Sequence, residues 1–151
     1  MILARFGRLT GRWQGSYRLT AEPSGPVRVS ESSATFTPVE GGLTRIDYTW
    51  DFEGTPQEGS LLLGYDQPRQ VFTAVWTDSW HMSDKPMVSE GPASSESVDV
   101  RGSYAAPPGP DWGWRTVIET AGADSFRMVM HNVSPDGQEY LAVDAEYHRA
   151  R

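Results

Sequence analysis

The feature that most constrains the fold is a series of turn signals at short, even intervals along the chain. Glycine and proline favour turns because the first has a free and the second a fixed φ. Clusters of these residues occur at 23–26, 38–42, 54–56, 66–68, 91–92, 107–110, 122–124 and 135–137. The segments between them are rich in Val, Thr, Tyr, Trp and Phe, which predicts strands. We expect these strands near 11–20, 27–37, 43–53, 58–65, 69–80, 86–90, 96–105, 112–121, 124–131 and 138–149.

Strands at this spacing, with no helical periodicity between them, predict an all-β fold. Only residues 2–10 are compatible with a short helix at the N-terminus. Consecutive strands joined by short turns form an antiparallel meander, and closing such a sheet removes its unpaired edges. We therefore predict a single antiparallel up-and-down β-barrel of about nine or ten strands, with residues 1–151 as one domain.

Alternation of residue type assigns the two faces of several strands. Between residues 43 and 53, apolar side chains alternate with charged ones, which is the pattern of a strand with one buried face. The predicted inward residues there are Ile46, Tyr48, Trp50 and Phe52. The same pattern predicts that further residues face inward: Trp112, Trp114, Ile118, Phe126, Met128 and Met130. Between 69 and 80 both faces are apolar, and we interpret the aromatic set Phe72, Trp76 and Trp80 as the inward one. In the last strand the predicted apolar face is Leu141, Val143, Ala145 and Tyr147.

Composition excludes several classes of function. The formal net charge of −7, with acidic residues along the whole chain, argues against a nucleic-acid partner. The chain has no cysteine and therefore no disulfide framework or thiolate metal site. It contains neither a signal-peptide-like N-terminus nor a stretch near the roughly 20 apolar residues of a membrane span. We expect a cytoplasmic protein with no membrane association.

Several short motifs carry a resemblance to a known family. They are Gly11-Arg-Trp13-Gln-Gly15, Gly64-Tyr-Asp-Gln-Pro68, Phe72 to Trp80, and Glu146-Tyr147-His148-Arg149. In this order they resemble a bacterial family of lipocalin-like (calycin) domains of unknown function, over roughly residues 8–149. The resemblance implies a barrel whose first strand bends at the glycines. It also implies that Trp13 plugs one end of the barrel, where Arg149 packs over it.

The inward aromatic and methionine residues are the candidate ligand site. A barrel of eight or more strands is wide enough to hold a small molecule, and binding sites are mostly apolar with few polar anchors. The predicted ligand-binding residues are Tyr48, Trp50, Trp76, Asp78, Trp80, Trp114, Met128 and Met130. Tyr48, Trp50 and Asp78 would be the polar anchors. The leading hypothesis is that the barrel sequesters a small apolar or aromatic ligand, without a cofactor or a metal ion.

Three alternatives remain open. In the first, the barrel is an isomerase or hydrolase with Asp78 or His81 as base, and an interior Asp78 would have a raised pKa. The alternative explanation of Asp78 is structural: its carboxylate would bond to local turn amides or to an arginine. In the second, the barrel binds haem, because nitrobindin-like barrels have a similar opening motif and one histidine that ligates iron.

In the third, the tryptophans fill the interior, and the domain is structural or binds a partner. A cavity below about 300 Å³ would favour this third alternative. The chain would then be a monomer or a homodimer, with Val71 and Val75 as a candidate dimer surface.

Overall fold

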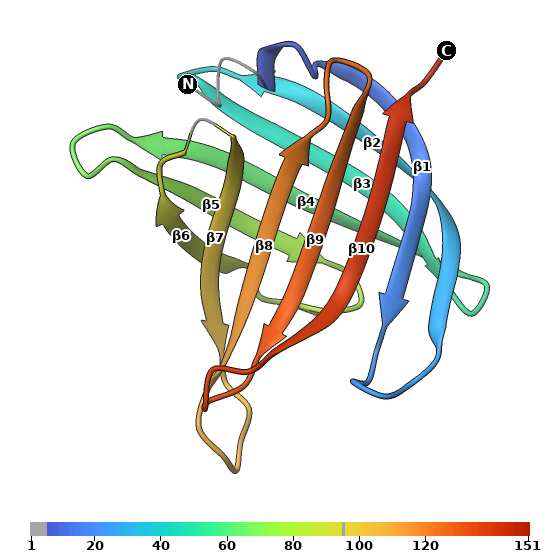
Figure 1. Cartoon of the computed structure of the whole chain (residues 1–151), viewed down its shortest axis with the longest axis vertical. Helices are drawn as coiled ribbons and strands as arrows, with labels where there is room; N and C mark the ends of the chain where they lie inside the picture. Colours follow the sequence, from blue (N-terminus) through green and yellow to red (C-terminus); the bar gives the residue numbers. More distant parts are fainter. Residues whose placement is uncertain (1–5, 95) are drawn as a thin grey trace.

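The computed structural model describes residues 6–94 and 96–151, which form ten antiparallel strands closed into a barrel (Figure 1). The strands are β1 (Gly11–Thr20), β2 (Val27–Val39), β3 (Leu43–Phe52), β4 (Thr55–Asp66), β5 (Val71–Asp78), β6 (Met87–Pro92), β7 (Ser97–Tyr104), β8 (Trp112–Thr120), β9 (Ser125–Val133) and β10 (Glu139–Arg149). Each strand pairs with its neighbours in sequence, and β1 pairs with β10, so that no edge of the sheet remains. The predicted all-β, antiparallel barrel is therefore confirmed.

The short helix expected over residues 2–10 is not confirmed. Residues 1–5 lie outside the described residues. Phe6 and Gly7 have helical backbone, and the chain then turns, with the amide of Leu9 donating to the carbonyl of Phe6 at 3.0 Å. Within the described residues no helix is long and apolar enough to cross a membrane.

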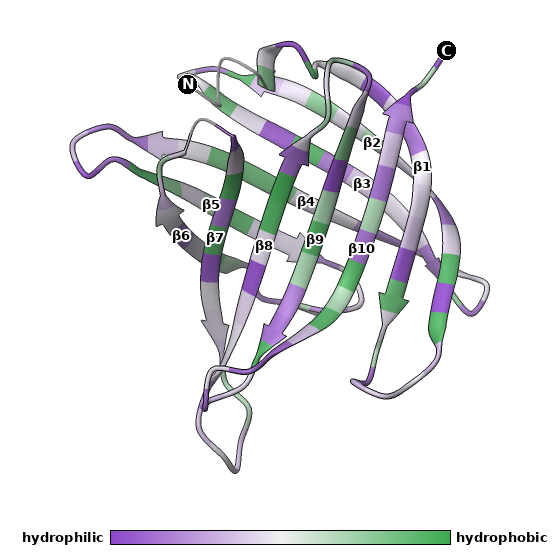
Figure 2. Ribbon diagram, in the orientation of Figure 1, coloured by the Kyte–Doolittle hydropathy of each residue, from purple (hydrophilic) through white to green (hydrophobic). Residues whose placement is uncertain are grey.

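Hydrophilic and hydrophobic residues alternate along the strands (Figure 2), and buried residues alternate with more exposed ones. The buried residues of β5 are Phe72, Ala74, Trp76 and Asp78, whereas Val75 is 37% exposed. The aromatic face of this strand therefore points inward, as interpreted from the sequence. In β3 the buried residues are Ile46, Tyr48 and Trp50, which also follow the predicted face.

The face predicted for the last strand is wrong at one position. Leu141, expected inside, is 44% exposed, while Ala142 and Val143 are both buried. The register of β10 against β9 shifts between Leu141 and Val143, which is a β-bulge. A bulge adds one residue and reverses the alternation on one side of it. The residues after the bulge, Ala145 and Tyr147, point inward as predicted.

One end of the barrel, which we call the closed end, is sealed by Trp13 and Arg149. Trp13 is fully buried and its indole N–H donates to the carbonyl of Leu9 at 2.9 Å. The guanidinium carbon of Arg149 lies 4.4 Å from the centre of the Trp13 ring. Arg149 also donates to the carbonyl oxygens of Arg8, Thr10 and Ala123.

The two glycines of the opening motif allow this arrangement. Gly11 has a φ of +121°, a conformation that side chains disfavour. A Cβ on Gly15 would lie 1.8 Å from the carbonyl oxygen of Glu146, so only glycine permits β1 to approach β10 this closely.

Candidate functional site

The candidate site lies at the opposite end of the barrel, which we call the open end. Because the strands are antiparallel, the last residues of β3, β5, β7 and β9 and the first residues of β6, β8 and β10 meet there. Asp78 is the last residue of β5, and Trp76 precedes it on the same face. Trp50 reaches the same place from β3, and Trp114 from β8.

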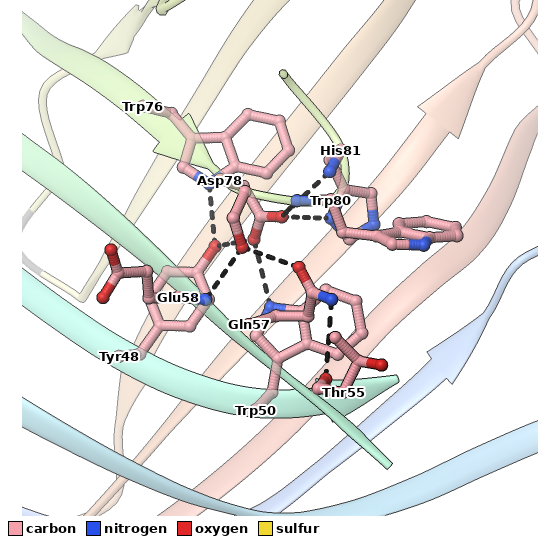
Figure 3. A network of polar contacts seen from close by, with 10 residues as sticks. Tyr48, Trp50, Thr55, Gln57, Glu58, Trp76, Asp78, Trp80 and His81 are labelled. Carbon is pink, nitrogen blue, oxygen red and sulfur yellow. Dashed lines mark hydrogen bonds and ion pairs between the residues drawn. The ribbon is translucent and has the colours of Figure 1, made fainter. Parts of the chain in front are cut away.

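Asp78 is buried, and both of its carboxylate oxygens accept several hydrogen bonds (Figure 3). Its Oδ2 accepts from the hydroxyl of Tyr48 at 2.7 Å and from the indole N–H of Trp50 at 3.3 Å. Its Oδ1 accepts from the backbone amides of Trp80 and His81, each at 2.9 Å. The turn after β5 thus wraps its amides around the carboxylate that ends the strand.

The donors around Asp78 determine its charge. A backbone amide and an indole nitrogen can only donate, and they occupy both oxygens. The hydroxyl of Tyr48 donates to Asp78 and accepts from the indole N–H of Trp76 at 2.9 Å. Hydrogen bonds donated to both oxygens stabilise the charged form, so we assign Asp78 as a carboxylate.

The pKa of Asp78 agrees with this assignment and corrects the raised value expected from the sequence. Burial has the largest effect and acts to raise the pKa, but hydrogen bonds from His81 and Tyr48 and the charge of His81 outweigh it. The pKa of Asp78 is consequently held below its usual value. The sequence indicated the burial but not the donors that reverse its effect.

His81 lies against Asp78 and within a ring of tryptophans. Its Nδ1 is 3.1 Å from Asp78 Oδ1, and its side chain is only 9% exposed. The imidazole centre lies 4.7 to 5.6 Å from the indole centres of Trp50, Trp76, Trp80 and Trp114. Because the carboxylate of Asp78 can only accept, Nδ1 carries the proton. In the neutral imidazole, Nε2 is then a hydrogen-bond acceptor.

A cavity of about 180 Å³ lies beside His81. Its buried walls are Trp76, Met87 and Trp114, and its half-buried rim consists of Trp80, His81, Met82, Tyr104 and Asn132. At the rim, the hydroxyl of Tyr104 donates to Asn132 Oδ1 at 2.5 Å, so that oxygen already has a partner. The cavity is therefore largely aromatic, with a few polar atoms.

One of those polar atoms has no partner. Trp114 is 5% exposed and stacks on Trp76 with ring centres 5.0 Å apart, yet its indole N–H makes no hydrogen bond within the described residues. A buried donor without an acceptor costs about 1–3 kcal/mol, so each such group calls for an explanation. The hydroxyl of Tyr17, which stacks on Trp50 at 4.6 Å, is a second buried group with no partner there.

A glycine makes room for the polar anchor. Gly59 of β4 pairs with Tyr48 on one side and with Asp78 on the other. A Cβ at this position would lie 2.2 Å from the Tyr48 hydroxyl oxygen. Only glycine therefore lets the tyrosine hydroxyl reach the carboxylate.

The structure divides the predicted ligand-binding residues into two groups. Trp76, Trp80 and Trp114 line the cavity. Tyr48, Trp50 and Asp78 lie behind His81 and orient it rather than line the cavity. Met128 and Met130 are buried in the barrel core. Trp112, at the start of β8, packs near Tyr140 with ring centres 6.3 Å apart.

The sequence interpretation missed Tyr104, Asn132, Met82 and Met87 as cavity residues and gave His81 a role only as an alternative base. Alternation could have identified Asn132, which continues the inward series Phe126, Met128 and Met130. Tyr104 likewise continues the inward series of Val98 and Val100 in β7. His81 and Met82 lie in the turn after β5, where no periodicity operates.

Two wider hollows lie at the barrel wall: one of about 610 Å³ at β3, β4 and the turn after β5, and one of about 950 Å³ that also reaches β1 and β2. Exposed polar side chains such as Glu58, Asp84 and Lys85 line much of them, together with Asp78 in the first and Trp50 in the second. Trp50 is the one aromatic residue among the described residues that line them, whereas the cavity at His81 has Trp76, Trp80, Tyr104 and Trp114. We therefore take the cavity at the open end as the candidate site.

Comparisons with known proteins give one family and one solved structure of similar fold. Residues 4–149 match the family described as "Protein of unknown function (DUF1579)". The crystal structure of Rv2717c from M. tuberculosis is similar, with a TM-score of 0.68 and 15% identity over 99% of this chain and 97% of that one. A redesigned beta barrel matches at a TM-score of 0.47 and 12% identity, over 97% of this chain and 95% of that chain. No curated protein matches the sequence significantly.

Proposed function

Because the chain belongs to the DUF1579 family, whose function is unknown, we propose a function from the site itself: the barrel binds a small planar aromatic molecule at its open end. The ligand would lie in the cavity between Trp114, His81 and the rim residues Tyr104 and Asn132. This proposal narrows the leading hypothesis from the sequence, in which the whole aromatic interior was the binding site.

The unpartnered indole N–H of Trp114 is the observation that carries the proposal. Other buried tryptophans of this chain have partners for their indole N–H groups. Trp13 donates to the carbonyl of Leu9, Trp50 to the carboxylate of Asp78, and Trp76 to the hydroxyl of Tyr48. Trp114 differs from them because its buried indole N–H has no partner within the described residues, while its side chain lines the cavity. A ligand atom that accepts this hydrogen bond would remove the cost of the unpaired donor.

The size of the cavity limits the ligand. A cavity of about 150 Å³ in another protein is enough to bind benzene, so 180 Å³ suits a molecule with one aromatic ring. The volume is below the roughly 300 Å³ of ordinary ligand pockets, which disfavours large lipids. A porphyrin is larger still, and the described side chains do not accommodate the haem of the nitrobindin-like alternative.

Nitrobenzene is a suitable probe because it combines one ring with hydrogen-bond acceptors. We expect saturable binding to one site by isothermal titration calorimetry. Trp114→Phe should weaken it about fivefold, since one hydrogen bond contributes on the order of 1 kcal/mol. Trp112→Phe is the matched control, because Trp112 lies outside the cavity, and it should bind like the wild type.

The filled-core alternative is the second candidate, and the small cavity is the observation that favours it. It predicts that neither nitrobenzene nor toluene binds saturably. It also predicts that Trp114→Phe and Trp112→Phe behave alike. Either result would replace the binding function with a structural one.

A further inference from the structure

We propose that the ligands of this site are weakly acidic aromatic hydroxyl compounds, of which phenol is the simplest, and that His81 accepts the hydroxyl proton. This inference rests on the proposed function, because it concerns the same cavity. It adds a chemical class and a proton-transfer step that aromatic binding alone does not require.

The first support is the orientation of His81. Asp78 is a carboxylate bonded to the Nδ1 proton, and its other donors hold it in place. In the neutral imidazole, Nε2, on the far side of the ring, is the basic atom. Within the described residues no side chain or backbone group is hydrogen-bonded to it. A histidine oriented by a buried carboxylate is the arrangement of a general base.

The second support is an unpartnered donor on a second side chain that lines the cavity. The imidazole centre of His81 lies 5.4 Å from the centre of the Trp114 ring, and both side chains line the cavity. A hydroxyl group donates its proton toward His81 Nε2 and accepts from the indole N–H of Trp114. An ether or a hydrocarbon satisfies at most one of these groups, and a phenol satisfies both.

The third support is the charge balance after proton transfer. The O–H bond of the ligand breaks and an N–H bond forms at His81 Nε2, which gives a phenolate and an imidazolium. The imidazolium stays against the carboxylate of Asp78, and the phenolate oxygen accepts from Trp114. No oxidant or other reactant takes part. The other titratable groups nearby, the hydroxyls of Tyr48 and Tyr104, remain protonated because burial raises the pKa of each.

A cationic ligand is the competing choice for a ring of tryptophans, which can bind ammonium groups through their faces. Two observations disfavour it. The unpartnered group of Trp114 is a donor, which an ammonium group cannot satisfy, and the carboxylate of Asp78 is not among the residues that line the cavity. The acidic hydroxyl class fits both the donor and the base.

The test uses p-nitrophenol, whose phenolate absorbs near visible wavelengths while its neutral form does not. At a pH about one unit below the pKa of the free compound, excess protein should increase the phenolate signal several-fold. His81→Gln keeps a polar side chain of similar length without a base. We expect it to bind the probe in the neutral form, with no increase in phenolate.

Nitrobenzene distinguishes the failure of this inference from that of the proposed function. If nitrobenzene binds and p-nitrophenol binds without ionising, the proton transfer is refuted and the aromatic site stands. If p-nitrophenol ionises equally with His81→Gln, His81 is not the base and the inference also fails. If the wild type binds neither compound, both proposals fall. The primary measurement is made on the wild type, so a variant that folds poorly does not decide the outcome.

Discussion

Both ends of the barrel contain a buried tryptophan, but the two ends differ in whether its indole N–H has a hydrogen-bond partner. At the closed end, the indole N–H of Trp13 has a carbonyl partner, and Arg149 donates to three more. At the open end, the buried indole N–H of Trp114 has no partner within the described residues, and its side chain lines a cavity. Since unpaired buried donors are costly, the pairing of Trp13 and Arg149 is that of a structural seal. The unpaired donor at the other end is the basis of the proposed ligand site.

The largest expected effect comes from removing the seal. Trp13→Ala deletes a fully buried indole that packs edge-on against Phe126 with ring centres 5.0 Å apart. Replacements of this kind cost about 3–5 kcal/mol. Urea unfolding followed by circular dichroism measures the loss. A loss below about 1.5 kcal/mol would show that the closed end does not depend on this side chain.

The next effect concerns the carboxylate at the open end. Asp78→Asn replaces an ion that accepts several hydrogen bonds with a neutral amide, and we expect a loss of about 2–3 kcal/mol at pH 7.

The pH dependence of Asp78 has a definite sign. Its folded pKa is lowered, so its contribution to stability is present above about 3.9, the pKa of an unfolded aspartate, and is lost as pH falls through the folded value. The stability difference between wild type and Asp78→Asn should therefore shrink below about pH 4. A difference that stays constant down to pH 2.5 in urea titrations would contradict the ionised assignment.

A smaller effect tests the contact that positions Asp78. In Gly59→Ala the added Cβ would meet the Tyr48 hydroxyl, and overpacking of this kind costs about 1–3 kcal/mol. Gly7→Ala is the matched control, because a Cβ there meets nothing within 4 Å. Thermal unfolding should separate the two variants. Equal melting temperatures would mean that Tyr48 moves aside without loss.

The smallest effect separates the two ends most directly. Trp13→Phe leaves the carbonyl of Leu9 without its donor, and we expect a loss of about 1–3 kcal/mol. Trp114→Phe removes an N–H that has no partner, so its cost should be below about 1 kcal/mol. Unfolding of the two variants in parallel measures the contrast. A larger loss with Trp114→Phe would reverse the assignment of the two ends.

The fold was largely predictable, because turn residues and period-two alternation are local signals. They predicted nine or ten strands and the inward positions of Tyr48 and Met128, whereas the inward position of Trp76 was inferred from the aromatic residues of its strand. The bulge at Ala142 was not predictable, since a single extra residue leaves no mark in the residue types. The site was only partly predictable. The inward position of Trp114 followed from alternation. The position of His81 depends instead on the turn after β5, in which the backbone amides of Trp80 and His81 donate to Asp78.

The pairing of β1 with β10 also has a consequence for how the chain folds. Trp13 and Arg149 are partners in this register although they lie near opposite ends of the sequence. Long-range pairs form slowly, because the chain must close a large loop before the contact is made. During synthesis the barrel cannot close until β10 has left the ribosome, and until then β1 and β9 each expose an unpaired edge. Loss of the last strand should therefore yield an aggregating polypeptide rather than a smaller barrel.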